Sequence, residues 1–134
     1  MKTSVCKLFR FEAAHYLPGY EGKCSTLHGH SWKLEVKISG LVDPNTGMVV
    51  DFVQLKNLVN DEIISKLDHT CLNESLDGEM EDLHGTVNPT CENLLEWIWA
   101  RLGATWINWS LDCGLTLERL RLWETPDSYA ELKV

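Results

Sequence analysis

The stretch His30-Ser-Trp-Lys-Leu-Glu-Val-Lys-Ile-Ser-Gly-Leu-Val42 decides the fold of this chain. Its apolar residues occupy every second position with charged residues between them, a pattern typical of a β-strand that has one dry face and one wet face. The dry face carries Trp32, Leu34, Val36 and Ile38. The turn signal Asp43-Pro-Asn-Thr-Gly47 follows, and we expect Met48–Val50 to return as the short second arm of a hairpin.

Two more strands lie nearer the ends of the chain. Val5–Ala13 predicts the first strand, because its apolar residues share one phase with Lys7 as the exception. Leu115–Trp123 predicts the last strand. Its apolar positions are odd at the start and even at the end, which indicates a bulge near Glu118-Arg119.

Two helices fill the middle of the chain. Asp51 stands where an N-cap belongs, and the apolar stripe from Leu55 to Leu67 repeats after it with helical spacing. Thr90 predicts the cap of a second helix, which we expect to end at Gly103. Between the two helices, the acidic stretch Asn73–Asp82 is typical of a solvated loop.

The order strand, hairpin, helix, helix, strand predicts an α+β fold: an antiparallel four-stranded sheet with two helices packed on one face. The length of 134 residues indicates a single domain over residues 1–134. Lys and Arg number 12 against 20 Asp and Glu, a formal net charge of −8, which disfavours a nucleic-acid partner. No stretch approaches the ~20 apolar residues of a membrane span, so we expect no membrane partner.

The N-terminus lacks the long apolar centre of a secretory signal, and the five cysteines include no CxxC pair. We therefore expect reduced thiols and a cytoplasmic protein. Four of the cysteines are interpreted as small buried hydrophobes, namely Cys6, Cys71, Cys91 and Cys113.

His28 and His30 share the strand phase of Trp32, so both imidazoles project from the dry face. One histidine on such a face is usually a satisfied core residue, but two in register each need a buried partner. His15 follows the first strand on its apolar phase, and three neutral imidazoles with an open fourth position suit a catalytic Zn²⁺ ion. The spacing to Glu35 matches a cupin metal motif, but Glu35 falls on the opposite strand phase.

Cys24 enters the strand four residues before His28, beside Lys23. It is either one more buried hydrophobe or a thiol whose pKa is lowered by Lys23 and a metal cation. Asp68-His69 is a pair that could hold one imidazole tautomer, or a helix end without chemistry. Glu124 ends an apolar strand row, either in solvent or at a pocket mouth, where it could bind a flat amidine-like group.

Six separated motifs agree in order with one family. They are Phe11-Glu-Ala-Ala-His-Tyr-Leu-Pro18, Cys24-x3-His28-Gly-His30, Gly47-Met-Val-Val-Asp-Phe-x-x-Leu-Lys56, Leu67-Asp-His-x-x-Leu-Asn73, Pro89-Thr-x-Glu-Asn-Leu94 and Trp123-Glu-Thr125. Together they resemble the 6-pyruvoyl-tetrahydropterin synthase family over about residues 5–125. Three residues separate Cys24 from His28, and this gap is similar to that of the bacterial 6-carboxy-5,6,7,8-tetrahydropterin synthase branch of the queuosine pathway.

The resemblance implies roles residue by residue. The zinc ligands of the family match His15, His28 and His30. Its general base matches Cys24, and the pair that completes the acid–base group matches Asp68 and His69. The carboxylate that anchors the 2-amino/N3 edge of the pterin matches Glu124, and the segment that forms the pterin pocket matches Thr90 and Glu92. Cations for a triphosphate are expected among Arg10, Lys23, Arg119 and Arg121.

The fold implied by the resemblance is the tunnelling fold, in which three subunits close a barrel and two rings stack into a homohexamer with active sites between subunits. The implied substrate is 7,8-dihydroneopterin triphosphate. A zinc-dependent carbon–carbon lyase would release triphosphate and acetaldehyde and leave 6-carboxy-5,6,7,8-tetrahydropterin. Two alternatives stay open: a 6-pyruvoyl-tetrahydropterin synthase, which keeps the three-carbon side chain, and a zinc-binding module without catalysis.

Overall fold

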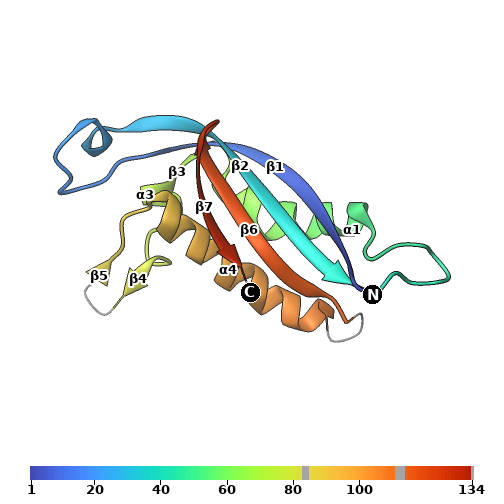
Figure 1. The fold of residues 1–134 in the computed structure, drawn as a ribbon. Helices are drawn as coiled ribbons and strands as arrows, with labels where there is room; N and C mark the ends of the chain where they lie inside the picture. Colours follow the sequence, from blue (N-terminus) through green and yellow to red (C-terminus); the bar gives the residue numbers. More distant parts are fainter. Residues whose placement is uncertain (83–84, 111–113, 134) are drawn as a thin grey trace.

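A computed structural model describes residues 1–82, 85–110 and 114–133. Five strands form one sheet in the order β3-β1-β2-β6-β7 (Figure 1). The strands are β1 (Thr3–His15), β2 (His28–Gly40), β3 (Thr70–Cys71), β6 (Thr116–Thr125) and β7 (Ser128–Lys133). The long strands pair antiparallel, and β1 meets β2 over its whole length, from Thr3 opposite Gly40 to His15 opposite His28.

The apolar phase of each long strand faces the helices, as the alternation predicts. The side chains of Phe11, Trp32, Leu34 and Leu122 are almost completely buried there, and the alternate residues face away from the core. The register between β2 and β6 shifts at Lys37/Ile38, which leaves Glu118 without a partner. This confirms the bulge predicted near Glu118.

Both main helices cover one face of the sheet (Figure 1). The first runs as α1 (Phe52–Val59), a π-helical turn η2 (Asn60–Ile64) and α2 (Ser65–Leu67), and the second is α4 (Cys91–Ser110). Asp51 caps α1, since its carboxylate accepts a 2.8 Å hydrogen bond from the Val53 amide. The Thr90 hydroxyl accepts one of 3.2 Å from the Asn93 amide at the start of α4. Both predicted caps are confirmed.

The predicted four-stranded antiparallel sheet is wrong in three respects. The two-residue strand β3 pairs parallel with β1, and the tail folds back as β7 after a turn at Pro126-Asp127. Met48–Val50 forms no strand. A hydrogen bond from the Asp43 amide to the Met48 carbonyl closes the turn, and the strand order of the described residues places β6, not this segment, beside β2.

The segment between the helices is more ordered than the predicted loop. It contains a short helix α3 (Leu72–Ser75) and a small hairpin of β4 (Glu81–Asp82) and β5 (Gly85–Thr86), and Leu76 and Met80 are buried.

The prediction that the second helix ends at Gly103 is also wrong. Gly103 keeps a helical backbone without positive φ, so α4 continues to Ser110. No helix in the described ranges has the length and apolar character needed to cross a membrane.

The cysteine prediction is correct for Cys91, which is buried. It is wrong for Cys6, which is exposed on the face of β1 away from the helices, and Cys71 is half-buried. Cys113 lies outside the described residues.

Candidate metal centre

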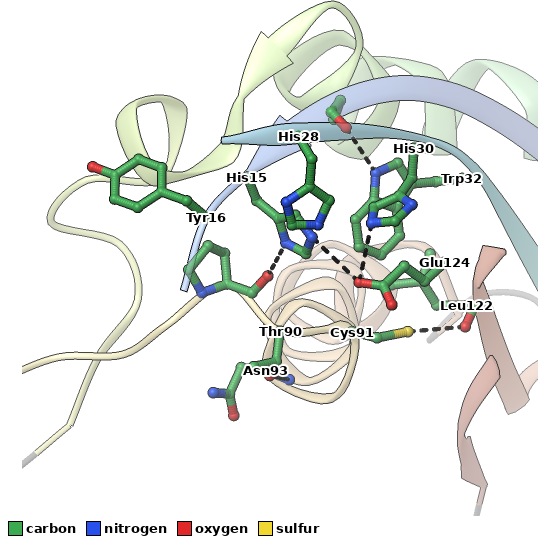
Figure 2. A network of polar contacts seen from close by, with 12 residues as sticks. His15, Tyr16, His28, His30, Trp32, Thr90, Cys91, Asn93, Leu122 and Glu124 are labelled. Carbon is green, nitrogen blue, oxygen red and sulfur yellow. Dashed lines mark hydrogen bonds and ion pairs between the residues drawn. The ribbon is translucent and has the colours of Figure 1, made fainter. Parts of the chain in front are cut away.

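Three histidines converge at one end of the sheet, on the face that carries the helices (Figure 2). His15 ends β1 directly opposite His28, the first residue of β2, and His30 lies two residues further along the same face of β2. One ring nitrogen from each histidine lies within 4.8 Å of the other two. The cluster therefore follows from strand register.

Backbone carbonyls fix the tautomers of two of these rings. Nδ1 of His15 donates a 2.8 Å hydrogen bond to the carbonyl oxygen of Pro89, and Nδ1 of His28 donates one of 2.7 Å to that of Thr26. A carbonyl oxygen can only accept, so the proton of each neutral ring is on Nδ1 and Nε2 presents a lone pair. Both rings are thus oriented as metal ligands, with the second nitrogen held by the surrounding chain.

The donor set fits a zinc ion. Nε2 of His15 and Nε2 of His30 are buried and have no hydrogen-bond partner among the described residues. Burial lowers the pKa of His30, the neighbouring His15 and His28 act in the same direction, and Glu124 opposes them. A neutral imidazole with a free lone pair is the form that binds zinc.

Trp32 and Glu124 complete the surroundings of the cluster. The Trp32 ring stands edge-on to His15, with 5.3 Å between ring centroids, and its Nε1 donates to the Ala13 carbonyl. Oε1 of Glu124 lies 3.3 Å from Nε2 of His15 and 3.7 Å from Nε2 of His30. The structure therefore brings Glu124 to the three histidines, on the strand phase that the sequence indicates.

Cys91, which the sequence predicts only as a buried core residue, lies beside Glu124 and the histidines (Figure 2). Its thiol donates a 3.1 Å hydrogen bond to the Leu122 carbonyl next to Glu124 (Figure 2). Burial raises the pKa of Cys91 to about 11. The residue therefore stays a neutral thiol at physiological pH and packs under the site as a structural group.

Cys24 lies in a short 3-10 turn, η1 (Lys23–Ser25), just before β2, and is half-buried. Its carbonyl accepts a 2.8 Å hydrogen bond from the Leu17 amide, which ties the turn to the chain that follows His15. In the described part of the chain, no hydrogen bond or ion pair joins the Cys24 thiol to a histidine of the cluster. Lys23 is exposed beside it.

Asp68 and His69 form a separate group at the edge of β1. Oδ1 of Asp68 lies 3.0 Å from Nδ1 of His69 and accepts a 2.9 Å hydrogen bond from the Glu12 amide. This backbone hydrogen bond, followed by the contact with His69, lowers the pKa of Asp68. The His69 side chain is 79% exposed, and within the described residues no ion pair links it to the three histidines.

His69 is held in a strained backbone conformation. Its φ is +59°, in the left-handed region that residues other than glycine rarely adopt, and its amide donates a 2.6 Å hydrogen bond to the Glu12 carbonyl. That bond directs the chain from α2 into β3. The geometry presents an exposed imidazole backed by a carboxylate.

The remaining predicted site residues fall on both sides of the sheet. Thr90 and Glu92 start α4, near the Pro89 carbonyl that orients His15. The cations Arg119 and Arg121 lie on the opposite face of the sheet, where each contacts Glu131. Arg10 is on that opposite strand phase too. Three of the four expected triphosphate cations therefore face away from the histidines of their own chain.

The structure thus combines an α+β fold with three histidines that fit a metal ion and an adjacent carboxylate, the donor set of a metal-dependent enzyme. The family model for 6-pyruvoyl tetrahydropterin synthase matches residues 4–134. The chain belongs to this family, and it is a lyase of the family.

Similar proteins carry more than one kind of name. The 6-carboxy-5,6,7,8-tetrahydropterin synthase of Haemophilus influenzae is 34% identical over 143 residues, covering 95% of this chain and 96% of that protein. That of Synechocystis is 41% identical over 102 residues, 73% of each chain. The dihydroneopterin monophosphate aldolase of Pyrococcus furiosus is 35% identical over 133 residues, 99% of each chain.

Among solved structures, the 6-pyruvoyl tetrahydropterin synthase of Caenorhabditis elegans superposes with a TM-score of 0.82 at 26% identity, covering 100% of this chain and 96% of that one. The fold is thus the one expected from the motifs, with a mixed five-stranded sheet.

Proposed function

We propose that this enzyme is a 6-carboxy-5,6,7,8-tetrahydropterin synthase of 7-deazaguanine biosynthesis. Its substrates would be 7,8-dihydroneopterin triphosphate and water, and its products 6-carboxy-5,6,7,8-tetrahydropterin, acetaldehyde and triphosphate. The observation that carries the proposal is the histidine cluster, with its bare Nε2 atoms beside Glu124 and the Cys24 turn directly before it. Relatives with this activity in their names are 34% and 41% identical to the chain.

Zinc held by His15, His28 and His30 would polarise the side-chain oxygens of the substrate as a Lewis acid. Glu124 would accept two N–H bonds from the 2-amino/N3 edge of the pterin and so orient the ring, because a carboxylate matches a flat amidine-like edge. Thr90 and Glu92 would shape the same end of the pocket.

Two groups outside the histidine cluster, Cys24 and the Asp68–His69 pair, would transfer protons. The Cys24 thiolate would remove a proton from a hydroxyl-bearing carbon of the side chain, and His69 would act as the partner acid, held by Asp68. The ring C6–N5 bond is reduced as the side chain becomes a diketone and loses triphosphate. Water then adds to the first carbonyl, and the carbon–carbon bond breaks to leave a carboxylate and acetaldehyde.

The separation of these groups supports assembly of the site from several copies. Asp68 and His69 sit at the edge of β1, and the cations Arg10, Arg119 and Arg121 face away from the cluster of their own chain. We propose a homohexamer, a dimer of trimers, in which neighbouring copies bring these groups to the histidines. Lys23 would contribute from the same copy as Cys24.

The aldolase relative favours a second candidate function. It is 35% identical over almost all of both chains, and its name gives a monophosphate as its substrate. Aldol cleavage of dihydroneopterin monophosphate would release a phosphorylated two-carbon aldehyde and leave a hydroxymethyl group on a dihydropterin. A 6-pyruvoyl-tetrahydropterin synthase would instead expel triphosphate and keep all three side-chain carbons.

Mass spectrometry of the products separates the three reactions. The zinc-loaded protein would be incubated in parallel with dihydroneopterin triphosphate and dihydroneopterin monophosphate. We expect turnover of the triphosphate to 6-carboxy-5,6,7,8-tetrahydropterin. A pyruvoyl product from the triphosphate, or preferred cleavage of the monophosphate, would overturn the proposal in favour of the corresponding alternative.

A further inference from the structure

The Glu124 carboxylate faces the bare nitrogens of the histidine cluster (Figure 2). Oε1 lies 3.3 Å from Nε2 of His15 and 3.7 Å from Nε2 of His30. Two ligands of a tetrahedral zinc ion, each about 2.0–2.1 Å from the metal, lie about 3.3 Å apart. The Glu124 oxygen is therefore at the separation of a second ligand from His15, and a few tenths of an ångström beyond it from His30.

When the His15 ring is neutral, this contact joins two hydrogen-bond acceptors, and these need a cation between them. Nε2 of His15 presents a lone pair because Nδ1 donates to the Pro89 carbonyl, and a carboxylate oxygen has lone pairs only. The His15 side chain is 1% exposed, so the repulsion is weakly screened by water. A proton would satisfy this one pair, whereas a metal ion would also use the bare Nε2 of His30 and the nearby ring nitrogen of His28.

The geometry of strand β6 positions Glu124 beside the histidine cluster. Glu124 continues the phase of Leu122, which faces the core, and it lies one residue beyond the last pair of β2 and β6, Lys33 opposite Trp123. The register of β6 and β7 slips between Trp123 and Thr125, which leaves Glu124 outside the pairing. In the part of the chain that the structure describes, the basic side chains that its carboxylate contacts are those of His15 and His30.

We infer that Glu124 is the fourth ligand of the metal in the substrate-free enzyme and leaves it when substrate enters. The side chain is 31% exposed, on the open side of the cluster, whereas strand backbone and carbonyl contacts hold the histidines. The inference rests on the proposed function in one respect. The amidine-like edge of the pterin is the group that would bind the Glu124 carboxylate and so remove it from the metal. The same carboxylate would then serve the metal and the substrate in turn.

Metal titration of the full chain without any pterin tests the inference. Co²⁺ replaces Zn²⁺ and absorbs more strongly in a four-coordinate than in a six-coordinate site, and the position of its visible band also changes when one ligand is exchanged for another. Wild type, Glu124→Gln, Glu124→His and Glu118→Gln would be titrated with Co²⁺, and then with Zn²⁺ against a chelator. Glu118 is the matched control, since it lies on the same strand and contacts Lys37.

We expect a four-coordinate band in wild type and in the Glu118→Gln variant. Glu124→Gln, which keeps the side-chain shape, should shift the band, because water or a weaker amide oxygen replaces the carboxylate as fourth ligand. It should also lower zinc affinity by about tenfold or more, at least the loss seen when residues that only support the ligands are removed. Glu124→His should recover zinc affinity, because the imidazole supplies a fourth protein ligand. A Glu124→Gln variant with the wild-type spectrum and affinity would overturn the inference, and so would a six-coordinate spectrum in wild type. Neither result depends on which pterin reaction the enzyme performs.

Discussion

His15 donates a 2.8 Å hydrogen bond from Nδ1 to the carbonyl oxygen of Pro89, on the segment that leads into α4. The two residues are 74 positions apart in the chain. The contact joins the end of β1 to the start of the second helix and orients the ring so that Nε2 points at His28, His30 and Glu124. The start of α4 thus helps to prepare the metal site.

Zinc should stabilise the folded chain, because the folded state alone brings the three histidines together. A ligand present at 100 times its Kd adds about 2.7 kcal/mol of stability. Thermal unfolding of the chelator-treated protein should therefore show a clear rise in Tm when zinc is added back. His28→Ala should lose most of that rise. Ser31→Ala, on the opposite face of the same strand, should keep it, and an equal rise in both variants would contradict the site.

Cys24→Ala should lower turnover strongly while zinc stays bound. General acid–base catalysis is typically worth about 10²–10⁴-fold, so a loss in that range is expected. Turnover and zinc content would be measured on the same samples. Cys6→Ala is the matched control, because Cys6 is an exposed thiol on the other face of β1. Wild-type turnover in a zinc-loaded Cys24→Ala protein would exclude the thiol as the base.

Asp68→Asn should reduce stability at neutral pH more than at acid pH. The pKa of Asp68 in the folded chain is lowered below its ordinary value of 3.8 by the Glu12 amide and by His69. A carboxylate with a lowered folded pKa contributes stability above the unfolded pKa and loses it as pH falls through the folded pKa. Denaturant unfolding of wild type and variant from pH 7 to pH 3 should show a difference that shrinks. A constant difference would contradict this prediction.

His69→Gly should separate stability from activity. Glycine adopts positive φ without strain, and a residue other than glycine in this region costs of order 1–3 kcal/mol, so the variant should be as stable as wild type or more stable. Turnover should nevertheless fall, since the imidazole is lost. Unfolding and steady-state kinetics check the two effects. Retained turnover would show that His69 has only a backbone role.

The sequence alone predicts the features that depend on the pattern of neighbouring residues. The alternation through Trp32 and Leu34 predicts both the strand and the common face of His28 and His30, and the phase of Leu120 and Leu122 carries Glu124 to that face. The caps at Asp51 and Thr90 are equally local signals, since each side chain bonds an amide two or three residues ahead.

Other features depend on contacts that no local pattern shows. The two residues of β3 are too few for a period, and they pair with β1 because the His69 amide bonds to Glu12. Gly103 resembled a helix end, but packing of Leu102 and the turns before it lets α4 continue. The tail did carry a usable signal: Ala130 and Leu132 alternate with polar residues after the Pro126 turn and pack on the core as β7.

The most direct test of the central claim is the ratio of acetaldehyde to triphosphate released from 7,8-dihydroneopterin triphosphate by the zinc-loaded enzyme. A 6-carboxy-5,6,7,8-tetrahydropterin synthase must release one acetaldehyde for each triphosphate, and both should stop when the metal is removed. Triphosphate release without acetaldehyde, or cleavage of the side chain without triphosphate release, would contradict the account.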